Sequence, residues 1–207
     1  MKRLMVFFMF VWFTAASIRA QDMEDLVSKN YFAVGASGGY YAPAGDFSKD
    51  TKGNAGPGVR IDVSLGITFY KIVQLRLDLD NEGHGENKSV PGTNKTTIKS
   101  STLSLRYYLV TGKFKPFVSA GGGLADVKVK TELASDSKSM ATYLAGIGCE
   151  WDISKNVGLD LLGQYRITPS KNAKFNVTGS DVKLGYNANS IGANLGLYYR
   201  FSFGSAM

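Results

Sequence analysis

The stretch that decides the fold is residues 58–69, which read GVRIDVSLGITF. Apolar side chains occupy the odd-numbered positions from Val59 to Phe69, and small or polar ones occupy the even-numbered positions. This is the period of a β-strand, in which successive side chains point to opposite faces. The segment is therefore predicted to be a strand with one apolar face and one polar face.

The same alternation recurs along most of the chain. It predicts further strands near residues 73–80, 103–109, 143–151, 157–161 and 193–203. Residues 31–41 and 114–129 also have strand character, but their glycines obscure the register and allow a β-bulge in each. Together with residues 59–69, these segments make eight predicted strands.

The connections between the predicted strands alternate in length. Three are short, near residues 70–72, 111–113 and 154–156, and four are long and polar, near 43–55, 81–97, 130–139 and 168–190. Short turns at one end and long loops at the other are typical of outer-membrane barrels. We therefore predict an all-β fold, an eight-stranded antiparallel up-and-down transmembrane β-barrel over residues 31–203.

Composition narrows the class of protein. The chain has 207 residues, of which 44% are hydrophobic and 20% charged, so intrinsic disorder is excluded. No stretch beyond the N-terminus offers the roughly 18 consecutive apolar residues of a spanning helix. Without residues 1–20 the charge is 21 basic minus 17 acidic residues, or +4, which is too small to indicate nucleic-acid binding.

The first twenty residues are predicted to be a secretory signal peptide. They begin with basic Lys2 and Arg3, continue with an apolar run over residues 4–16, and end in small residues that allow cleavage after Ala20 or after Ser17. A membrane-anchoring helix is the alternative, and it would need a longer apolar run. Residues 21–30 are then expected to form a short periplasmic segment, and residues 204–207 a C-terminal extension.

Period alone does not decide whether the apolar face touches lipid or lines the cavity of a soluble, lipocalin-like barrel. The polar face carries many glycines, which suit the narrow interior of eight strands, and the apolar face carries bulky side chains. We therefore expect the apolar face to contact hydrocarbon. Aromatic residues near the short turns predict a girdle at the membrane interface, made by Phe69, Tyr107, Phe117, Trp151, Tyr199, Phe201 and Phe203.

The charged residues also follow the two faces. Every arginine after the signal segment lies on the polar face of a predicted strand, whereas the lysines lie in loops, turns or strand ends. A guanidinium suits a buried, two-pronged pair with a carboxylate, and an ammonium prefers water. A network of balanced ion pairs is therefore predicted to seal the lumen, formed by Arg60, Asp62, Arg76, Asp78, Asp80, Arg106, Glu150, Asp160, Arg166 and Arg200.

Alternating strand direction sorts these ten residues by depth. Four fall toward the short turns and six toward the middle and the loop end, so we expect two separate layers of ion pairs. The alternative is that the same charges line a water-filled pore.

Three segments resemble the OmpA/OmpX-like outer-membrane β-barrel superfamily, with OmpW-like proteins as a second possibility. These are YYAPAGDF at 40–47, the KPF and AGGG pair within 115–123, and the closing residues 195–203. The resemblance implies location in the outer membrane of a Gram-negative-type bacterium and insertion by the barrel-assembly machinery. In that family a terminal aromatic is read by this machinery, whereas here four residues follow Phe203.

The resemblance implies a structural or surface-interaction role, and this is the function we favour. The expected partners are outer-membrane lipids, lipopolysaccharide and a host surface ligand held by the long extracellular loops. A narrow pore or an OmpW-like channel for small solutes is the alternative.

A lipid A-modifying enzyme is the least favoured function, and we expect no enzymatic activity. His84, the only histidine, falls in a predicted solvated loop, and no catalytic motif accompanies it. Asp46, Ser48 and Asp50 have the spacing of calcium ligands but lack the glycine and closing glutamate of such a loop. No metal or cofactor is therefore expected.

Overall fold

The computed structural model describes residues 30–48, 58–84, 93–131, 135–177, 180–183 and 187–203. The predicted signal peptide, nearly all of the segment 21–30 and the extension 204–207 lie outside these residues. Among the described residues, no helix is long and apolar enough to cross a membrane.

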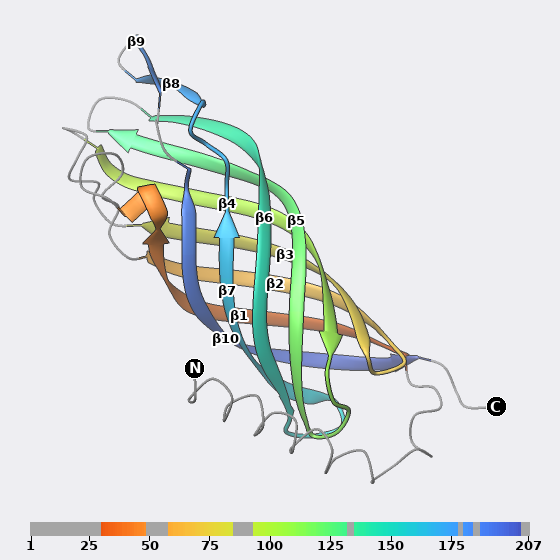
Figure 1. Ribbon diagram of the computed structural model, residues 1–207. Helices are drawn as coiled ribbons and strands as arrows, with labels where there is room; N and C mark the ends of the chain where they lie inside the picture. Colours follow the sequence, from red (N-terminus) through yellow and green to blue (C-terminus); the bar gives the residue numbers. More distant parts are fainter. Residues whose placement is uncertain are drawn as a thin grey trace, which may run out of the picture.

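Eight antiparallel strands close into a barrel in the order β1-β10-β7-β6-β5-β4-β3-β2 (Figure 1). The strands are β1 (Asn30–Ala44), β2 (Gly58–Phe69), β3 (Val73–His84), β4 (Thr93–Tyr108), β5 (Phe114–Thr131), β6 (Ser135–Asp152), β7 (Val157–Ile167) and β10 (Asn189–Phe203). Each strand pairs with the next barrel strand along the chain, and β10 closes the ring on β1. The predicted up-and-down topology is confirmed.

The long connections are more structured than the sequence suggested. A 3-10 turn, η2 (Gly45–Ser48), follows β1, and a hairpin of β8 (Lys174–Val177) and β9 (Ser180–Lys183) precedes β10. Figure 1 shows both at the end opposite the short turns. Strands β3, β4 and β6 also continue into predicted loops, because cross-strand pairs such as Glu82 with Ile98 satisfy their backbones.

The two faces of the sheet differ as predicted over most of its height. In β2 every even-numbered residue is buried and every odd-numbered residue is exposed. The exposed ones are apolar, among them Ile61, Val63 and Leu65, and the buried ones include Arg60 and Asp62. An apolar outer wall around a charged interior excludes the lipocalin-like alternative and matches a barrel immersed in hydrocarbon.

In β4 and β5 the two faces exchange polarity near the loop end. In β4, Leu103 points outward, whereas four positions nearer the loops Lys99 points outward and Ile98 is buried inside. In β5 the same exchange occurs between Leu124, which is exposed, and Val127, which is buried. The outer wall therefore changes from apolar to polar partway up β4 and β5.

Neither segment suspected of a bulge contains one. Residues 31–41 pair without interruption with both neighbouring strands, and residues 114–129 do so with β6. The alternation in 114–129 is irregular because the apolar residues move from the outer to the inner face along the strand. The one register shift between β4 and β5 in the described chain lies between Thr93 and Lys95.

Candidate functional site

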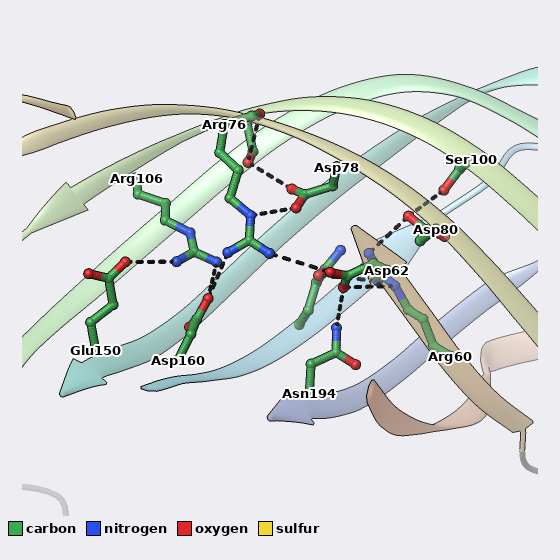
Figure 2. A network of polar contacts seen from close by, with 12 residues as sticks. Arg60, Asp62, Arg76, Asp78, Asp80, Ser100, Arg106, Glu150, Asp160 and Asn194 are labelled. Carbon is green, nitrogen blue, oxygen red and sulfur yellow. Dashed lines mark hydrogen bonds and ion pairs between the residues drawn. The ribbon is translucent and has the colours of Figure 1, made fainter. Parts of the chain in front are cut away.

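Arg76 of β3 lies at the centre of the lumen. Its Nη1 lies 2.6 Å from Asp160 Oδ2, its Nη2 lies 3.6 Å from Asp62 Oδ1, and its Nε donates to Asp78. Asp160 comes from β7, on the wall opposite β3. One buried guanidinium thus connects opposite walls of the barrel, as Figure 2 shows.

The network continues from Asp160 toward the short turns. Arg106 Nη2 lies 2.8 Å from Asp160 Oδ2, and Arg106 Nη1 lies 3.3 Å from Glu150 Oε1. The other oxygen of Glu150 lies 3.2 Å from Arg200 Nη2, and the Tyr108 hydroxyl also donates to Glu150. Strands β4, β6, β7 and β10 are linked in this way.

From Asp62 the network continues toward the loops. Arg60 lies 3.8 Å from Asp62 and 2.9 Å from Asp80, measured between nitrogen and oxygen. Arg166 binds both oxygens of Asp80, with its Nη1 at 2.9 Å and its Nη2 at 2.7 Å. The hydroxyl of Ser100 donates to the same carboxylate at 2.7 Å, so Asp80 is surrounded by donors.

The structure brings all ten predicted residues into this network, and all ten are buried. The expected division into two separate layers is wrong. Arg76 contacts both Asp160 of the lower group and Asp62 of the upper group, because its long side chain reaches across the lumen. The ion pairs therefore form one connected chain along the barrel.

Glu82 and His84 also belong to the network but were not predicted. Arg166 Nη1 lies 3.5 Å from Glu82, and His84 Nε2 lies 2.6 Å from Glu82 Oε1. The expectation of a solvated loop histidine is wrong, because β3 extends to His84 and its even-numbered positions all face inward. Extending the alternation of Gln74 to Asp80 by four residues would have predicted that Glu82 and His84 also face the lumen.

Lys115 and Asp152 complete the network at the short-turn end. Lys115 Nζ lies 3.1 Å from Asp152 Oδ1 and 3.6 Å from Glu150 Oε2. Arg200 also donates to Asp152. Lys115 was not predicted because lysine usually prefers water. It is buried because its odd-numbered position on β5 faces the lumen.

Phe117 was predicted to be a girdle residue, but it lies inside the barrel. It is 1% exposed and its ring centroid lies 4.3 Å from Arg106 Cζ. Phe117 shares the inward phase of Lys115, and glycine at position 148 makes room for its ring: a Cβ there would lie 2.5 Å from Phe117 Cζ. An aromatic side chain near a turn can thus pack over a cation in the lumen as well as lie at the membrane interface.

The other predicted girdle residues are placed differently. The side chains of five are exposed on the outer wall near the short turns: Phe69, Tyr107, Trp151, Tyr199 and Phe201. Phe203 ends β10, and its side chain lies outside the described part of the structure.

An apolar cluster lies above the network, at the loop end of the barrel. Phe47 of η2 is fully buried with Ile98, Ala125, Val127 and Ala188. The Phe47 ring also lies edge-on to His84, with ring centroids 5.1 Å apart. The 3-10 turn η2 thus packs onto the end of the ion-pair chain, a contact that the predicted loop at 43–55 did not indicate.

Comparison with known proteins agrees with this architecture. Residues 8–201 match the family described as outer membrane protein beta-barrel domain. The chain is 29% identical over 183 residues to outer membrane protein PagN of Salmonella typhimurium. The alignment covers 73% of this chain and 74% of PagN.

Similar solved structures include two small outer-membrane proteins. Neisserial surface protein A has a TM-score of 0.53 and 17% identity, covering 83% of this chain and 97% of that one. Outer membrane protein W of E. coli has a TM-score of 0.49 and 16% identity, covering 84% and 98%. Because the family match covers nearly the whole sequence, the chain belongs to the outer-membrane β-barrel family and lies in the outer membrane of a Gram-negative bacterium.

Proposed function

We propose that this protein is a structural or surface-interaction barrel with a sealed lumen. The observation that carries the proposal is the unbroken chain of buried ion pairs from Arg200 to Glu82, linked through Arg76. The cluster around Phe47 covers the loop end of this chain. An ion crossing the barrel would have to displace both.

The energetics of buried charges support a sealed lumen. Removing one partner of a buried pair costs about 3 to 5 kcal/mol, because the other charge is left without compensation. A passing ion would separate several such pairs at once, including those of Arg76 with Asp62 and Asp160. The network therefore acts as a structural plug in this proposal.

The proposed partners follow from the outer wall. Its apolar band would contact outer-membrane lipids, and the exposed aromatic residues near the short turns would lie at the lipid headgroups. Above the band, exposed Lys99 and Lys128 would lie near lipopolysaccharide phosphates. The extracellular loops would present the surface for ligands of another cell, and the barrel-assembly machinery would insert the protein.

The placement of His84 supports a role without catalysis. It is the only histidine in the chain, and it is buried between Glu82 and the ring of Phe47. A group so enclosed is poorly placed to transfer protons to a lipid substrate. The mass of lipid A, measured in cells with and without the protein, is expected to be the same.

Conductance in planar lipid bilayers tests the sealed lumen. The purified, folded protein should give no steady ion current at concentrations where a general porin does. The double variant Arg76→Ala, Phe47→Ala should give a current, because it removes the central cation and the cover together. A stable ohmic current from the unaltered protein would contradict the proposal.

A further inference from the structure

Two neighbouring short turns of the barrel carry one exposed lysine each. Lys113 lies in the turn between β4 and β5, and Lys155 lies in the turn between β6 and β7. The backbone N–H of Asp152 donates to the carbonyl oxygen of Lys113 at 2.7 Å, so the two turns lie side by side. Short turns of outer-membrane barrels face the periplasm. Both lysines are therefore placed at the headgroups of the periplasmic leaflet.

Backbone hydrogen bonds hold both turns in shape. In the first turn, the N–H of Leu109 donates to the carbonyl oxygen of Pro116 at 2.8 Å. In the second turn, the N–H groups of Ile153 and Ser154 each donate to the carbonyl oxygen of Val157 at 3.0 Å. A ligand would therefore have to order only the lysine side chains, which keeps the entropic cost of binding small.

The outer wall beside the two lysines is aromatic and apolar. Phe114 of β5 pairs across the strands with Trp151 of β6, and both side chains are exposed. Ile153, in the same turn as Lys155, is exposed as well. Aromatic rings of this kind lie at the level of the lipid headgroups. A lipid that packs against this wall would bring its phosphate to the lysines.

Carboxylates of the barrel do not neutralise these two lysines. Asp152 is the acidic residue nearest to Lys155 in the sequence, but its carboxylate lies 3.1 Å from Lys115 Nζ and also accepts from Arg200. The other acidic residues that the structure describes near these turns, Glu150 and Asp160, are buried in the lumen network. Two positive charges are therefore left for a group of the membrane to balance.

We propose that these two turns form a site that selects phospholipids with a net negative headgroup. Lys113 and Lys155 bind the lipid phosphate, while Phe114 and Trp151 contact the glycerol and the upper acyl chains. A zwitterionic headgroup brings its own cation next to the phosphate, so the lysines favour the lipid that lacks this cation. The inference rests on the proposed contact with outer-membrane lipids and names the headgroup.

Fluorescence of Trp151 tests the site directly. A Trp12→Phe change leaves Trp151 as the only tryptophan of the chain. The folded protein is placed in bilayers of phosphatidylcholine with brominated acyl chains, which quench a tryptophan that they touch. Adding unbrominated phosphatidylglycerol should relieve the quenching at least about fivefold more effectively than adding unbrominated phosphatidylcholine. High salt should weaken this preference, because it screens the lysines.

Lysine variants locate the preference. Lys113→Gln and Lys155→Gln should each lower it by up to about fivefold, the effect expected of one lysine near an anionic lipid surface, and the double variant should bind both lipids equally. The control is Lys71→Gln, an identical charge change in the short turn between β2 and β3, across the barrel from β6 and β7. It should leave the preference measured at Trp151 unchanged. Heat-modifiable mobility on gels shows that each variant is folded.

Equal relief by the two lipids in the unaltered protein, or an equal loss in Lys71→Gln, would overturn the proposal. Quenching without a headgroup preference would overturn this site but keep the proposed lipid contact of the outer wall. Absence of quenching by the brominated lipid would contradict both. The conductance measurement is independent of all these results, so the lipid site and the sealed lumen fail separately.

Discussion

The two ends of β4 differ in which kind of side chain faces outward and which faces the lumen. In the half nearer the short turns, Leu103 and Leu105 point outward and Arg106 points inward. In the half nearer the loops, Lys99 points outward and Ile98 points inward. The strand keeps its period of two throughout, and only the polarity of each face changes.

This difference indicates that the medium outside the barrel determines the polarity of the side chains on its inner face. Where the wall meets hydrocarbon, charged side chains are confined to the lumen, and they need partners there. Where the wall meets water, the strands return to the arrangement of a soluble protein, with a core such as Val127 and its neighbours. We therefore propose that the upper boundary of the membrane lies between Leu103 and Lys99.

The largest expected effect comes from breaking the lumen network at its centre. Arg76→Ala leaves Asp62, Asp78 and Asp160 without their shared cation and should lower the free energy of unfolding by about 3 to 5 kcal/mol. Thermal unfolding of the folded barrel in detergent, followed by gel mobility, measures the loss. The exposed-turn variant Lys155→Ala should unfold like the unaltered protein, and equal unfolding of both variants would contradict a buried network.

A smaller loss of stability is expected from a change in the apolar cluster at the loop end. Phe47→Ala empties the centre of the cluster with Ile98 and Val127 and should cost about 3 kcal/mol. The η2 segment is expected to become more sensitive to protease, while the barrel keeps its heat-modifiable mobility. If limited proteolysis found η2 equally resistant in the variant, the Phe47 side chain would not hold η2 in place.

Exchanging residues across the proposed boundary sharpens the comparison. Leu103→Lys places a charge against hydrocarbon and should destabilise the barrel by about 2 kcal/mol. Lys99→Leu lies on the same face of β4 but in water, so it should change stability by less than about 0.5 kcal/mol. Denaturant titration in lipid vesicles measures both, and equal effects would place the boundary elsewhere.

The sequence predicted the fold and the ten charged residues of the lumen because apolar and polar residues alternate along the strands that face lipid. Residues 58–69 obey that rule over their whole length. The alternation was harder to interpret in residues 114–129, where the apolar residues move from the outer to the inner face. This change in the pattern resembles the effect of a bulge, although the strand pairs without one. The prediction failed for Phe117, whose chemistry suits lipid, but whose position on β5 points to Arg106.

Contacts between distant segments were beyond reach of any local pattern. The packing of Phe47 against Ile98 joins the 3-10 turn η2 to β4, two segments that are far apart in the sequence. A hollow at the loop end, lined by Lys138, Lys171 and Asn187, likewise depends on contacts among β6, the segment after β7 and Asn187. Composition describes such loops as polar, but it does not give their shape.

The smallest expected effect concerns the turn between β2 and β3, outside both regions. Tyr70 and Lys71 have φ angles of 50° and 56°, and Ile72 N donates to Phe69 O at 3.1 Å. Positive φ at both central residues is the signature of a type I′ turn, which favours Asn-Gly. The double variant Tyr70→Asn, Lys71→Gly should gain about 1 kcal/mol in the same unfolding assay, and a loss would contradict this turn.

Thiol labelling along β4 tests the central claim most directly. Single cysteines at Lys99, Leu103 and Ser104, in a Cys149→Ala background, are exposed to a small, charged methanethiosulfonate reagent in intact outer membranes. Lys99→Cys should react rapidly, whereas Leu103→Cys, against lipid, and Ser104→Cys, buried beside Asp78, should be protected. Rapid reaction of Ser104→Cys would instead show a water-filled lumen and contradict the account.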